Sequence, residues 1–265
     1  TKGYVGLGVS SANVNFADMW EYSAVSNTWL AKAAFPGAAR NRCVAFLIGS
    51  KAYFGLGGGA VSNYADMYEY DPAFNSWSTK ASFAGLARSY AVGFSIGTNG
   101  YAGLGSTTGA VVDFWKYDSG LNSWTQVSAF AAVNRLNPAG FCINEKIYFG
   151  TGDSNDKLLN DLWEWDPGTE LWTQKADFIG VARYNAVSFS INGKGYLGLG
   201  TAASGTVSDF YQYDPVTNVW TAKASFGGGT RTQAAGFAIG DKGYVGTGAS
   251  TTALASVLND FWEYN

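Results

Sequence analysis

Histidine is absent from the 265 residues of this chain, and its absence removes several kinds of chemistry. Neither a Ser-His-Asp nor a Cys-His nucleophilic site can form without it. Zinc sites that use histidine ligands are excluded for the same reason. The sequence therefore points away from histidine-dependent enzymes before any motif is considered.

Cysteine, charge and long apolar segments are also scarce. The two cysteines, Cys43 and Cys142, occupy different positions in the repeat described below, so they predict small buried side chains rather than a disulfide framework. Charged residues make up 14% of the chain and the net charge is −3, which gives no basic surface for nucleic acid. No apolar run approaches the ~20 residues of a membrane helix. We expect neither a nucleic-acid partner nor a membrane span.

What the sequence has in abundance is repetition. The heptad Lys-Gly-Tyr-Leu-Gly-Leu-Gly that begins at Lys194 recurs in similar form from Lys2, Lys51, Asn99, Lys146 and Lys242. Tryptophans recur every 47 or 48 residues, at Trp29, Trp77, Trp124, Trp172 and Trp220. Arginines keep the same step, at Arg40, Arg88, Arg135, Arg183 and Arg231. So do aspartates, except for a last interval of 51, at Asp18, Asp66, Asp113, Asp161, Asp209 and Asp260. A period of this length indicates a repeat architecture, and we treat residues 1–265 as one domain.

Each repeat predicts four antiparallel strands. Residues 186–191 alternate large and small side chains, which predicts a strand with a bulky face and a slim face. Asn192-Gly193 predicts a two-residue hairpin turn into the heptad, which forms the second strand. Residues 209–213 predict the third strand, and Trp220 opens the fourth. Because neither face of the first strand carries charge, we expect the bulky face of one sheet to pack on the slim face of the next.

These features resemble the Kelch family of β-propellers. The resemblance rests on the Tyr-x-Gly-x-Gly heptads, the Tyr-Asp-Pro turns at Tyr70 and Tyr213, the Asn-x-Trp pairs, and the arginine before each first strand. It implies an all-β, six-bladed propeller with four antiparallel strands per blade and the first strand lining a central channel. The chain supplies two strands fewer than six complete blades need, so we expect it to begin and end within a blade. Kelch blades usually carry adjacent glycines, whereas here they are spaced as Gly-Leu-Gly or Gly-Thr-Gly.

The predicted binding site lies on the rim where the loops between second and third strands emerge together with the crossovers between sheets. These loops vary in length, with 9, 8, 7, 8, 8 and 11 residues between the closing glycine and the repeated aspartate. Variable loops on a rigid scaffold favour recognition. Two positions after each repeated arginine the residue type is not fixed, and we predict that this set binds the ligand: Arg42, Tyr90, Asn137, Asn185 and Gln233. The alternative is that these side chains fill a wet channel mouth.

The residues that are identical in every repeat predict structure rather than binding. We expect the five repeated arginines to hold backbone carbonyls or the repeated aspartate of a neighbouring repeat. We expect the six repeated aspartates to accept hydrogen bonds from backbone N–H groups and so close their loops. The oxygen-rich loop 153–157 is expected to be a solvated loop rather than a calcium site, because it lacks the spacing of a calcium loop and contains Lys157.

The favoured function is a non-catalytic scaffold that binds a protein segment or a glycan on this rim, without a cofactor or a metal. One alternative is an enzyme acting on sugars, since some Kelch-like six-bladed propellers isomerise sialic acid; Asp153 or Asp156 would supply its acid. Another is a structural surface or filament domain that self-associates through the incomplete blade. The abundance of Ser, Thr, Asn and Gly with a pI of about 5.0 favours an extracellular or cell-surface setting.

Overall fold

The computed structural model describes residues 2–154 and 157–264, which form two compact units. The N-terminal unit is Lys2–Leu136 and the C-terminal unit begins at Asn137. Each unit is described by itself below. The chain is all-β, and the described residues contain one short 3₁₀ turn, η1 (Leu254–Ser256), in the longest loop. No helix in the described part of the chain could cross a membrane.

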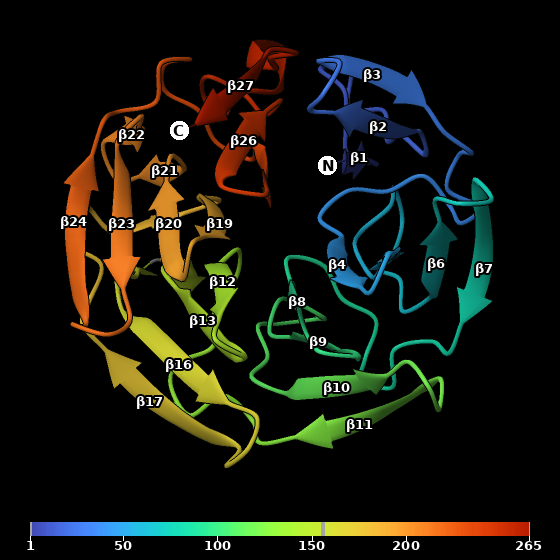
Figure 1. Ribbon diagram of the computed structural model, residues 1–265, viewed down its shortest axis with the longest axis horizontal. Helices are drawn as coiled ribbons and strands as arrows, with labels where there is room; N and C mark the ends of the chain where they lie inside the picture. Colours follow the sequence, from blue (N-terminus) through green and yellow to red (C-terminus); the bar gives the residue numbers. More distant parts are fainter. Residues whose placement is uncertain (1, 155–156, 265) are drawn as a thin grey trace. The chain divides into compact units, whose positions relative to one another are not determined.

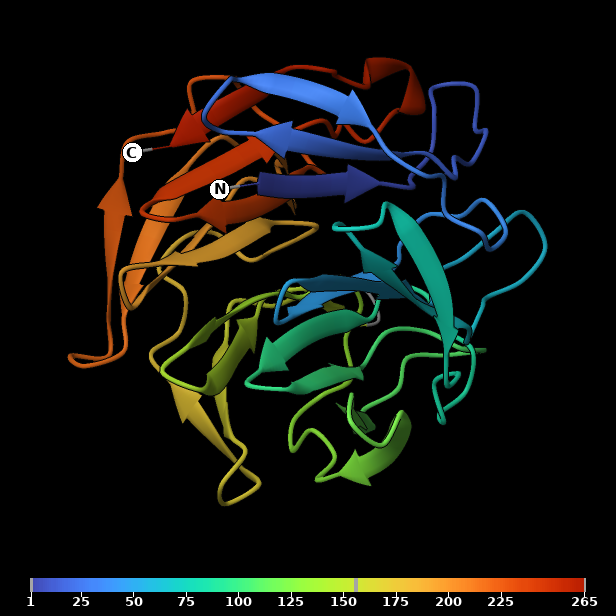
Figure 2. The same ribbon diagram turned by 45° about the vertical axis from the view of Figure 1, so that its right-hand side comes forward.

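The N-terminal unit contains three antiparallel sheets in which strands adjacent in sequence are adjacent in space (Figure 1). The first sheet has three strands, β1 (Lys2–Gly6), β2 (Met19–Ser23) and β3 (Thr28–Ala31), which run side by side in shades of blue in Figure 2. The second has four, β4 (Val44–Ile48), β5 (Lys51–Gly55), β6 (Met67–Asp71) and β7 (Ser76–Lys80). The third also has four, β8 (Val92–Ile96), β9 (Asn99–Gly103), β10 (Phe114–Asp118) and β11 (Ser123–Val127).

The C-terminal unit repeats the arrangement and ends in a three-stranded sheet. Its four-stranded sheets are β12 (Ala139–Ile143), β13 (Lys146–Gly150), β16 (Leu162–Asp166), β17 (Leu171–Lys175), and then β19 (Val187–Ile191), β20 (Lys194–Gly198), β23 (Phe210–Asp214), β24 (Val219–Lys223). The last sheet is β25 (Ala235–Ile239), β26 (Lys242–Gly246) and β27 (Phe261–Tyr264). Two-residue strands occupy the loops and one crossover: β14 (Asp153–Ser154), β15 (Lys157–Leu158), β18 (Arg183–Tyr184), β21 (Thr201–Ala202) and β22 (Gly205–Thr206).

The predicted two-residue turns join the first and second strands. Residues 49–50 link β4 to β5, and the turn from β19 to β20 has a φ of 51° at Asn192 and 70° at Gly193. Gly97 and Gly240 begin the equivalent turns at φ values of 56° and 63°. Left-handed φ angles are what a tight hairpin requires, and Asn or Gly supplies them at low cost. The hairpin predictions are confirmed.

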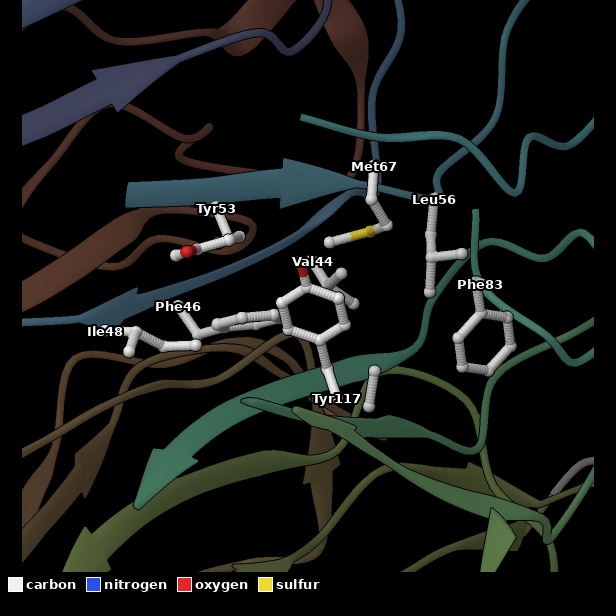
Figure 3. Packing of buried hydrophobic residues seen from close by; sticks show 9 residues of the cluster. Val44, Phe46, Ile48, Tyr53, Leu56, Met67, Phe83 and Tyr117 are labelled. Atoms are coloured by element: carbon white, nitrogen blue, oxygen red, sulfur yellow. The ribbon is translucent and has the colours of Figure 1, made fainter. Parts of the chain in front are cut away.

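Sheets within a unit pack with a bulky face against a slim one, as predicted. In the N-terminal unit, Phe46 of β4 lies against Gly100 of β9, where an added Cβ would come within 2.3 Å of the Phe46 ring. In the C-terminal unit, Phe189 of β19 meets Gly243 of β26 in the same way, at 2.4 Å. Figure 3 shows Phe46 in the cluster that fills the space between two sheets, together with Val44, Ile48 and Tyr117. The glycines of the heptad therefore make room for the ring of the preceding sheet.

The two cysteines differ in part from their prediction. Cys43 and Cys142 are free thiols, and both are half-buried rather than fully buried. Burial still raises the pKa of the Cys43 thiol to about 12. Because the thiolate is the reactive form, Cys43 is an inert side chain at neutral pH.

Candidate functional site

The repeated arginines lie in the crossovers between sheets and are almost completely buried. Arg40, Arg88, Arg135, Arg183 and Arg231 are each exposed by no more than 1%. Each guanidinium lies over the ring of a phenylalanine from its own crossover, with centroid distances between 4.7 and 5.0 Å. A buried charge is costly unless it is paired, so the position demands an anionic partner.

That partner is the repeated aspartate of the following sheet. Arg88 Nη2 donates to Asp113 Oδ2 at 2.7 Å, while Arg88 Nη1 also donates to the carbonyl oxygen of Leu104 at 3.2 Å. The same two-pronged arrangement joins three further pairs: Arg40–Asp66, Arg183–Asp209 and Arg231–Asp260. In these four crossovers the arginines hold both a backbone carbonyl and the aspartate of a neighbouring repeat, as the sequence predicts.

The carboxylates of the repeated aspartates have further side-chain partners that the sequence did not predict. Their carboxylates pair mainly with side chains, and Asp113 Oδ2 also accepts from Trp115 Nε1 at 2.8 Å. Asp18 and Asp161 accept from the tryptophan two residues later, also at 2.8 Å. The loop-closing contact is made instead by the backbone oxygen, as when Leu104 N donates to Asp113 O at 3.1 Å. The aspartates thus accept backbone N–H groups as expected, but mainly through their backbone oxygens, because the carboxylates take the stronger charge-assisted fork from arginine.

The ion pairs with arginine lower the pKa values of the Asp113 and Asp209 carboxyl groups. Burial alone would raise the pKa of the Asp113 carboxyl, but the hydrogen bonds from Arg88 and Trp115 outweigh it and lower that pKa. Burial is likewise outweighed at Asp209, where the Arg183 hydrogen bond lowers the pKa of the carboxyl. These carboxylates are charged and fully engaged, which removes them from the set of candidate catalytic acids.

The crossovers and loops are tied together by backbone bonds. In the N-terminal unit, Asn41 and Gly58 form an antiparallel bridge, and Gly57 N donates to Arg88 O at 2.8 Å. In the C-terminal unit, β18 pairs with β21 in the same role, and Gly200 N donates to Arg231 O at 2.8 Å. The loops that vary in length are therefore anchored at their bases to the crossover of the next repeat.

All five predicted binding residues have the same unusual backbone conformation. Their φ angles are left-handed: Arg42 57°, Tyr90 60°, Asn137 51°, Asn185 54° and Gln233 57°. Tyr90 N donates to Arg42 O at 3.3 Å in the N-terminal unit. In the C-terminal unit, Asn185 N donates to Asn137 O and Gln233 N to Asn185 O, each at 3.3 Å. One backbone position is thus held in register from repeat to repeat within each unit, while its side chain changes.

Arg42 and Tyr90 are the pair that the structure brings into side-chain contact. The Arg42 guanidinium carbon lies 4.4 Å from the centre of the Tyr90 ring, a distance typical of a cation–π contact. Arg42 is exposed and forms no ion pair with any described residue, unlike the buried arginines. The three loop segments of the same unit, 9–17, 58–65 and 106–112, contain no charged residue. Arg42 is therefore an unneutralised cation in a unit whose three loop segments carry no charge.

Leucines provide a contrast to these five positions. Leu56, Leu104 and Leu199 also have left-handed φ angles, of 53°, 58° and 60°, but their side chains are completely buried. Packing offsets the backbone strain at the leucines. Arg42 and Gln233 are exposed and gain no such packing. At Arg42 and Gln233 the left-handed backbone therefore costs of order 1 kcal/mol that burial of the side chain does not offset.

The described residues at the two ends of the acidic loop pair with each other in the C-terminal unit. Asp153–Ser154 pairs with Lys157–Leu158 as a small antiparallel ladder, and Asp153 Oδ1 is buried without a hydrogen-bond partner among the described residues. Asn155 and Asp156, which belong to the same predicted loop, lie outside the described residues. No group of three or more acidic or cysteine side chains that could hold a metal was found in the part of the chain described.

A second repeated network was missed by the sequence interpretation. Glu69 of β6 accepts from the Tyr53 hydroxyl and forms ion pairs with Lys51 at 2.9 Å and Lys80 at 3.1 Å. Glu21 and Glu164 have the same surroundings in their own sheets. The available signal was a lysine and a tyrosine at the first and third heptad positions with a glutamate in the next strand. These glutamates are covered by lysines, so they too are structural.

The Asn-x-Trp pairs have a role that the sequence did not predict. Asn75 Oδ1 accepts from Ala33 N at 2.8 Å, and Trp77 Nε1 donates to Ala33 O at 2.8 Å. Equivalent pairs bind Ala81 and Ala176 by both backbone groups. Each Asn-Trp pair thus hydrogen-bonds both backbone groups of one alanine in the preceding repeat and joins the two neighbouring sheets.

Comparison with known proteins gives the fold and no activity. No family model matches the chain, and no curated protein matches it significantly. Among solved structures, the structure of YjhT is similar with a TM-score of 0.83 and 15% sequence identity over 99% of this chain and 91% of that one. Altogether 546 chains of known structure match, so the fold is common and does not by itself select a function.

Proposed function

We propose that this chain is a six-bladed, Kelch-like β-propeller with one blade incomplete, and that it serves as a non-catalytic recognition module. The face-to-face packing of sheets within each unit and the likeness to the YjhT structure support the propeller. An experimental structure with its sheets in a line, rather than round a common axis, would refute it.

The ligand of this module is a protein segment or a glycan, bound by the left-handed crossover residues Arg42, Tyr90, Asn137, Asn185 and Gln233 and by the adjoining loops. The observation that carries the proposal is that these positions share one left-handed backbone conformation, whereas their side chains vary as Arg, Tyr, Asn, Asn and Gln. Where a strained residue gains nothing from burial, function is the inference that the outlier supports. The proposed setting is extracellular or at the cell surface.

Within this surface, Arg42 and Tyr90 are the proposed anchors. Tyrosine and arginine dominate binding energy at interfaces because they offer large rigid area and directed hydrogen bonds. Arg42 is already oriented by the Tyr90 ring at 4.4 Å, so less side-chain freedom is lost on binding. Its planar fork suits a carboxylate, a sulfate or a pair of carbonyl oxygens on the ligand.

The test is a screen followed by a matched pair of variants. The protein is applied to an array of neutral and acidic oligosaccharides and to a peptide array, and the affinity for each positive probe is then measured. We expect the double variant Arg42→Ala, Tyr90→Ala to bind at least about tenfold more weakly. Lys223→Ala, which removes an exposed positive charge from β24, should bind unchanged. Equal affinity of the double variant and the parent protein would refute the site.

A second candidate is an enzyme acting on a sugar, with Asp153 as its acid. The observation that favours it is the buried Asp153 Oδ1, which has no hydrogen-bond partner among residues 2–154 and 157–264, because buried polar atoms are usually satisfied. An isomerisation assay on sialic acid and related sugars, with Asp153→Asn and Asp156→Asn variants, separates the candidates. Turnover that disappears with Asp153→Asn would favour the enzyme, and absence of turnover in the parent protein would remove it.

A further inference from the structure

The loop between β13 and β16 carries an acid at a position where the following repeats have an uncharged residue. Asp153 follows the closing glycine of its heptad, and Thr201 and Ala249 hold the equivalent positions in the next two repeats. The Oδ1 atom of Asp153 is buried and has no hydrogen-bond partner among residues 2–154 and 157–264. An unpaired buried carboxylate oxygen is costly, so a ligand that satisfies it gains correspondingly.

The lysine of the same loop does not neutralise this carboxylate. In the ladder of β14 and β15, Asp153 lies opposite Leu158, and Ser154 lies opposite Lys157. Because successive side chains on a strand point to opposite faces, Lys157 lies on the face of the ladder away from Asp153. Lys157 is exposed, and Asp153 forms no ion pair with any residue in the described ranges. The charge of Asp153 is therefore uncompensated within its loop.

The equivalent residue of the next repeat shows which way the Asp153 side chain points. Thr201 Oγ1 donates to Thr232 Oγ1 at 2.8 Å, and Thr232 is the residue after the buried arginine of the next crossover. The residue at that place in the crossover that follows Asp153 is Tyr184. By this equivalence, the carboxylate of Asp153 is directed towards Tyr184.

Two further observations support this placement. In the N-terminal unit, the same two positions are Gly58 and Ser89, and a Cβ added at Gly58 would lie 3.6 Å from the Cβ of Ser89. In the C-terminal unit, Gly152 N donates to Arg183 O at 2.7 Å. The residues immediately before the aspartate and the tyrosine are thus bonded to each other, so the loop and the crossover are held side by side.

The aspartate and the tyrosine differ from the threonine pair because their polar groups are not satisfied. Tyr184 is half-buried, and its hydroxyl makes no hydrogen bond within the part of the chain described. A carboxylate beside an aromatic ring offers a charged acceptor together with a face on which a flat group can stack. The two side chains therefore form an acceptor site whose own partner is not supplied by the described residues.

The charge of the C-terminal unit favours a cationic ligand. Residues 137–265 contain eight lysines and arginines against thirteen aspartates and glutamates, whereas residues 2–136 contain nine against seven. An excess of acids attracts cations and disfavours anions. The left-handed crossover residues of this unit, Asn137, Asn185 and Gln233, are uncharged amides that can accept hydrogen bonds from a cation without opposing its charge.

We propose that Asp153 and Tyr184 bind an arginine side chain of a protein segment. The carboxylate accepts the forked N–H groups of the guanidinium, and the guanidinium plane stacks on the tyrosine ring. Asp153 is half-buried, so the guanidinium reaches both oxygens once the carboxyl group rotates about its soft terminal torsion. Arginine suits the site better than lysine because its planar fork matches a carboxylate and is more weakly hydrated.

This inference rests on the recognition function proposed above and gives the ligand of this part of the surface a chemical class. The probe is blocked arginine, N-acetyl-arginine amide, and its control is the corresponding citrulline compound, which has nearly the same shape without the charge. Binding to the isotope-labelled full chain is followed by the shifts of its backbone amide NMR signals. We expect saturable shifts at residues 152–154 and 184–186, and at least about fivefold weaker binding of the citrulline probe.

Two variants that remove one negative charge each give a matched comparison. Asp153→Asn should bind blocked arginine about tenfold more weakly or worse, because the charged acceptor is lost. Asp241→Asn removes an exposed charge from the turn between β25 and β26 and should bind as the parent protein does. Asp153→Asn should unfold at no lower temperature than the parent, because it removes a buried charge that has no partner in the described chain. Tyr184→Leu should also weaken binding, by about threefold, because the stacking face is lost.

The proposal is overturned by equal affinities for the two probes, by equal effects of the two aspartate variants, or by shifts that miss residues 152–154 and 184–186. Binding of a neutral methyl glycoside at these residues in place of arginine would overturn it in favour of a glycan. Each of these outcomes leaves the Arg42–Tyr90 site standing, because its own variant pair tests that site. An array screen without a positive probe would refute the Arg42–Tyr90 site, whereas saturable binding of arginine at Asp153 would still support the present inference.

Discussion

Two arginines that lie two residues apart, Arg40 and Arg42, have opposite environments. Arg40 is fully buried, paired with Asp66 and held over Phe35, and its equivalents are arginines in every crossover. Arg42 is exposed, stacked on Tyr90, and its equivalents are Tyr, Asn, Asn and Gln. Both positions repeat with the same backbone geometry. The comparison shows that a buried, paired charge requires arginine at the first position. The left-handed backbone at the second position does not by itself require one residue type.

The largest expected effect is the loss of stability when a buried arginine of the repeat is replaced. Arg183→Ala leaves the partly buried carboxylate of Asp209 without its cationic partner and opens a cavity against Phe178. We expect a loss of about 3–5 kcal/mol in the free energy of unfolding, measured by urea denaturation. Arg42→Ala should cost less than about 1 kcal/mol, because exposed substitutions rarely cost more. Equal losses for the two variants would break the comparison.

A second substitution separates strain from packing. Leu56→Gly removes a fully buried side chain from a left-handed position, so it relieves strain but empties part of the core. We expect a net loss of about 2 kcal/mol or more, since the lost packing exceeds the strain relieved. Differential scanning calorimetry gives the result. A more stable Leu56→Gly protein would show that packing does not hold these leucines in place.

Acid should weaken the buried ion pairs in a defined pH range. The folded pKa values of Asp113 and Asp209 are lowered from the ordinary value of 3.8, so their contribution to stability is present above that value. It is lost as the pH falls below about 4 towards the folded pKa values. Urea midpoints measured between pH 6 and pH 3 should fall steeply at the acid end. Asp209→Asn should be less stable at pH 6 and should show a shallower acid loss than the parent protein.

The smallest expected effect lies at the exposed position. Arg42→Gly removes the contact with Tyr90 but relieves a left-handed φ of 57°, so the two changes offset each other. The free energy of unfolding should stay within about 0.5 kcal/mol of the parent value, by urea denaturation. Gln233→Gly provides the matched case in the C-terminal unit. A loss above about 1 kcal/mol in either variant would mean that these side chains have a structural role after all.

The period and face pattern of the sequence were enough to predict the strands, the hairpin turns and the packing of Phe46 on a slim neighbouring face. They also predicted that Arg88 and its equivalents hold a carbonyl or an aspartate, and the structure shows Arg88 holding both. The hydrogen bond from Trp115 Nε1 to the Asp113 carboxylate was not predicted, because a spacing of two residues does not fix which way the indole ring turns. The left-handed conformation of Arg42 and Tyr90 was equally hidden, because neither residue is typical of that region.

The ladder of backbone bonds that fixes Arg42, Tyr90 and their equivalents has a practical consequence. Because main-chain atoms alone hold each of these residues in place, one codon per repeat can be randomised while the surrounding framework is left intact. A library of such replacements would vary a surface without asking the scaffold to refold around each choice. The residues that maintain the fold are thus distinct from the surface positions that could be varied to bind a ligand.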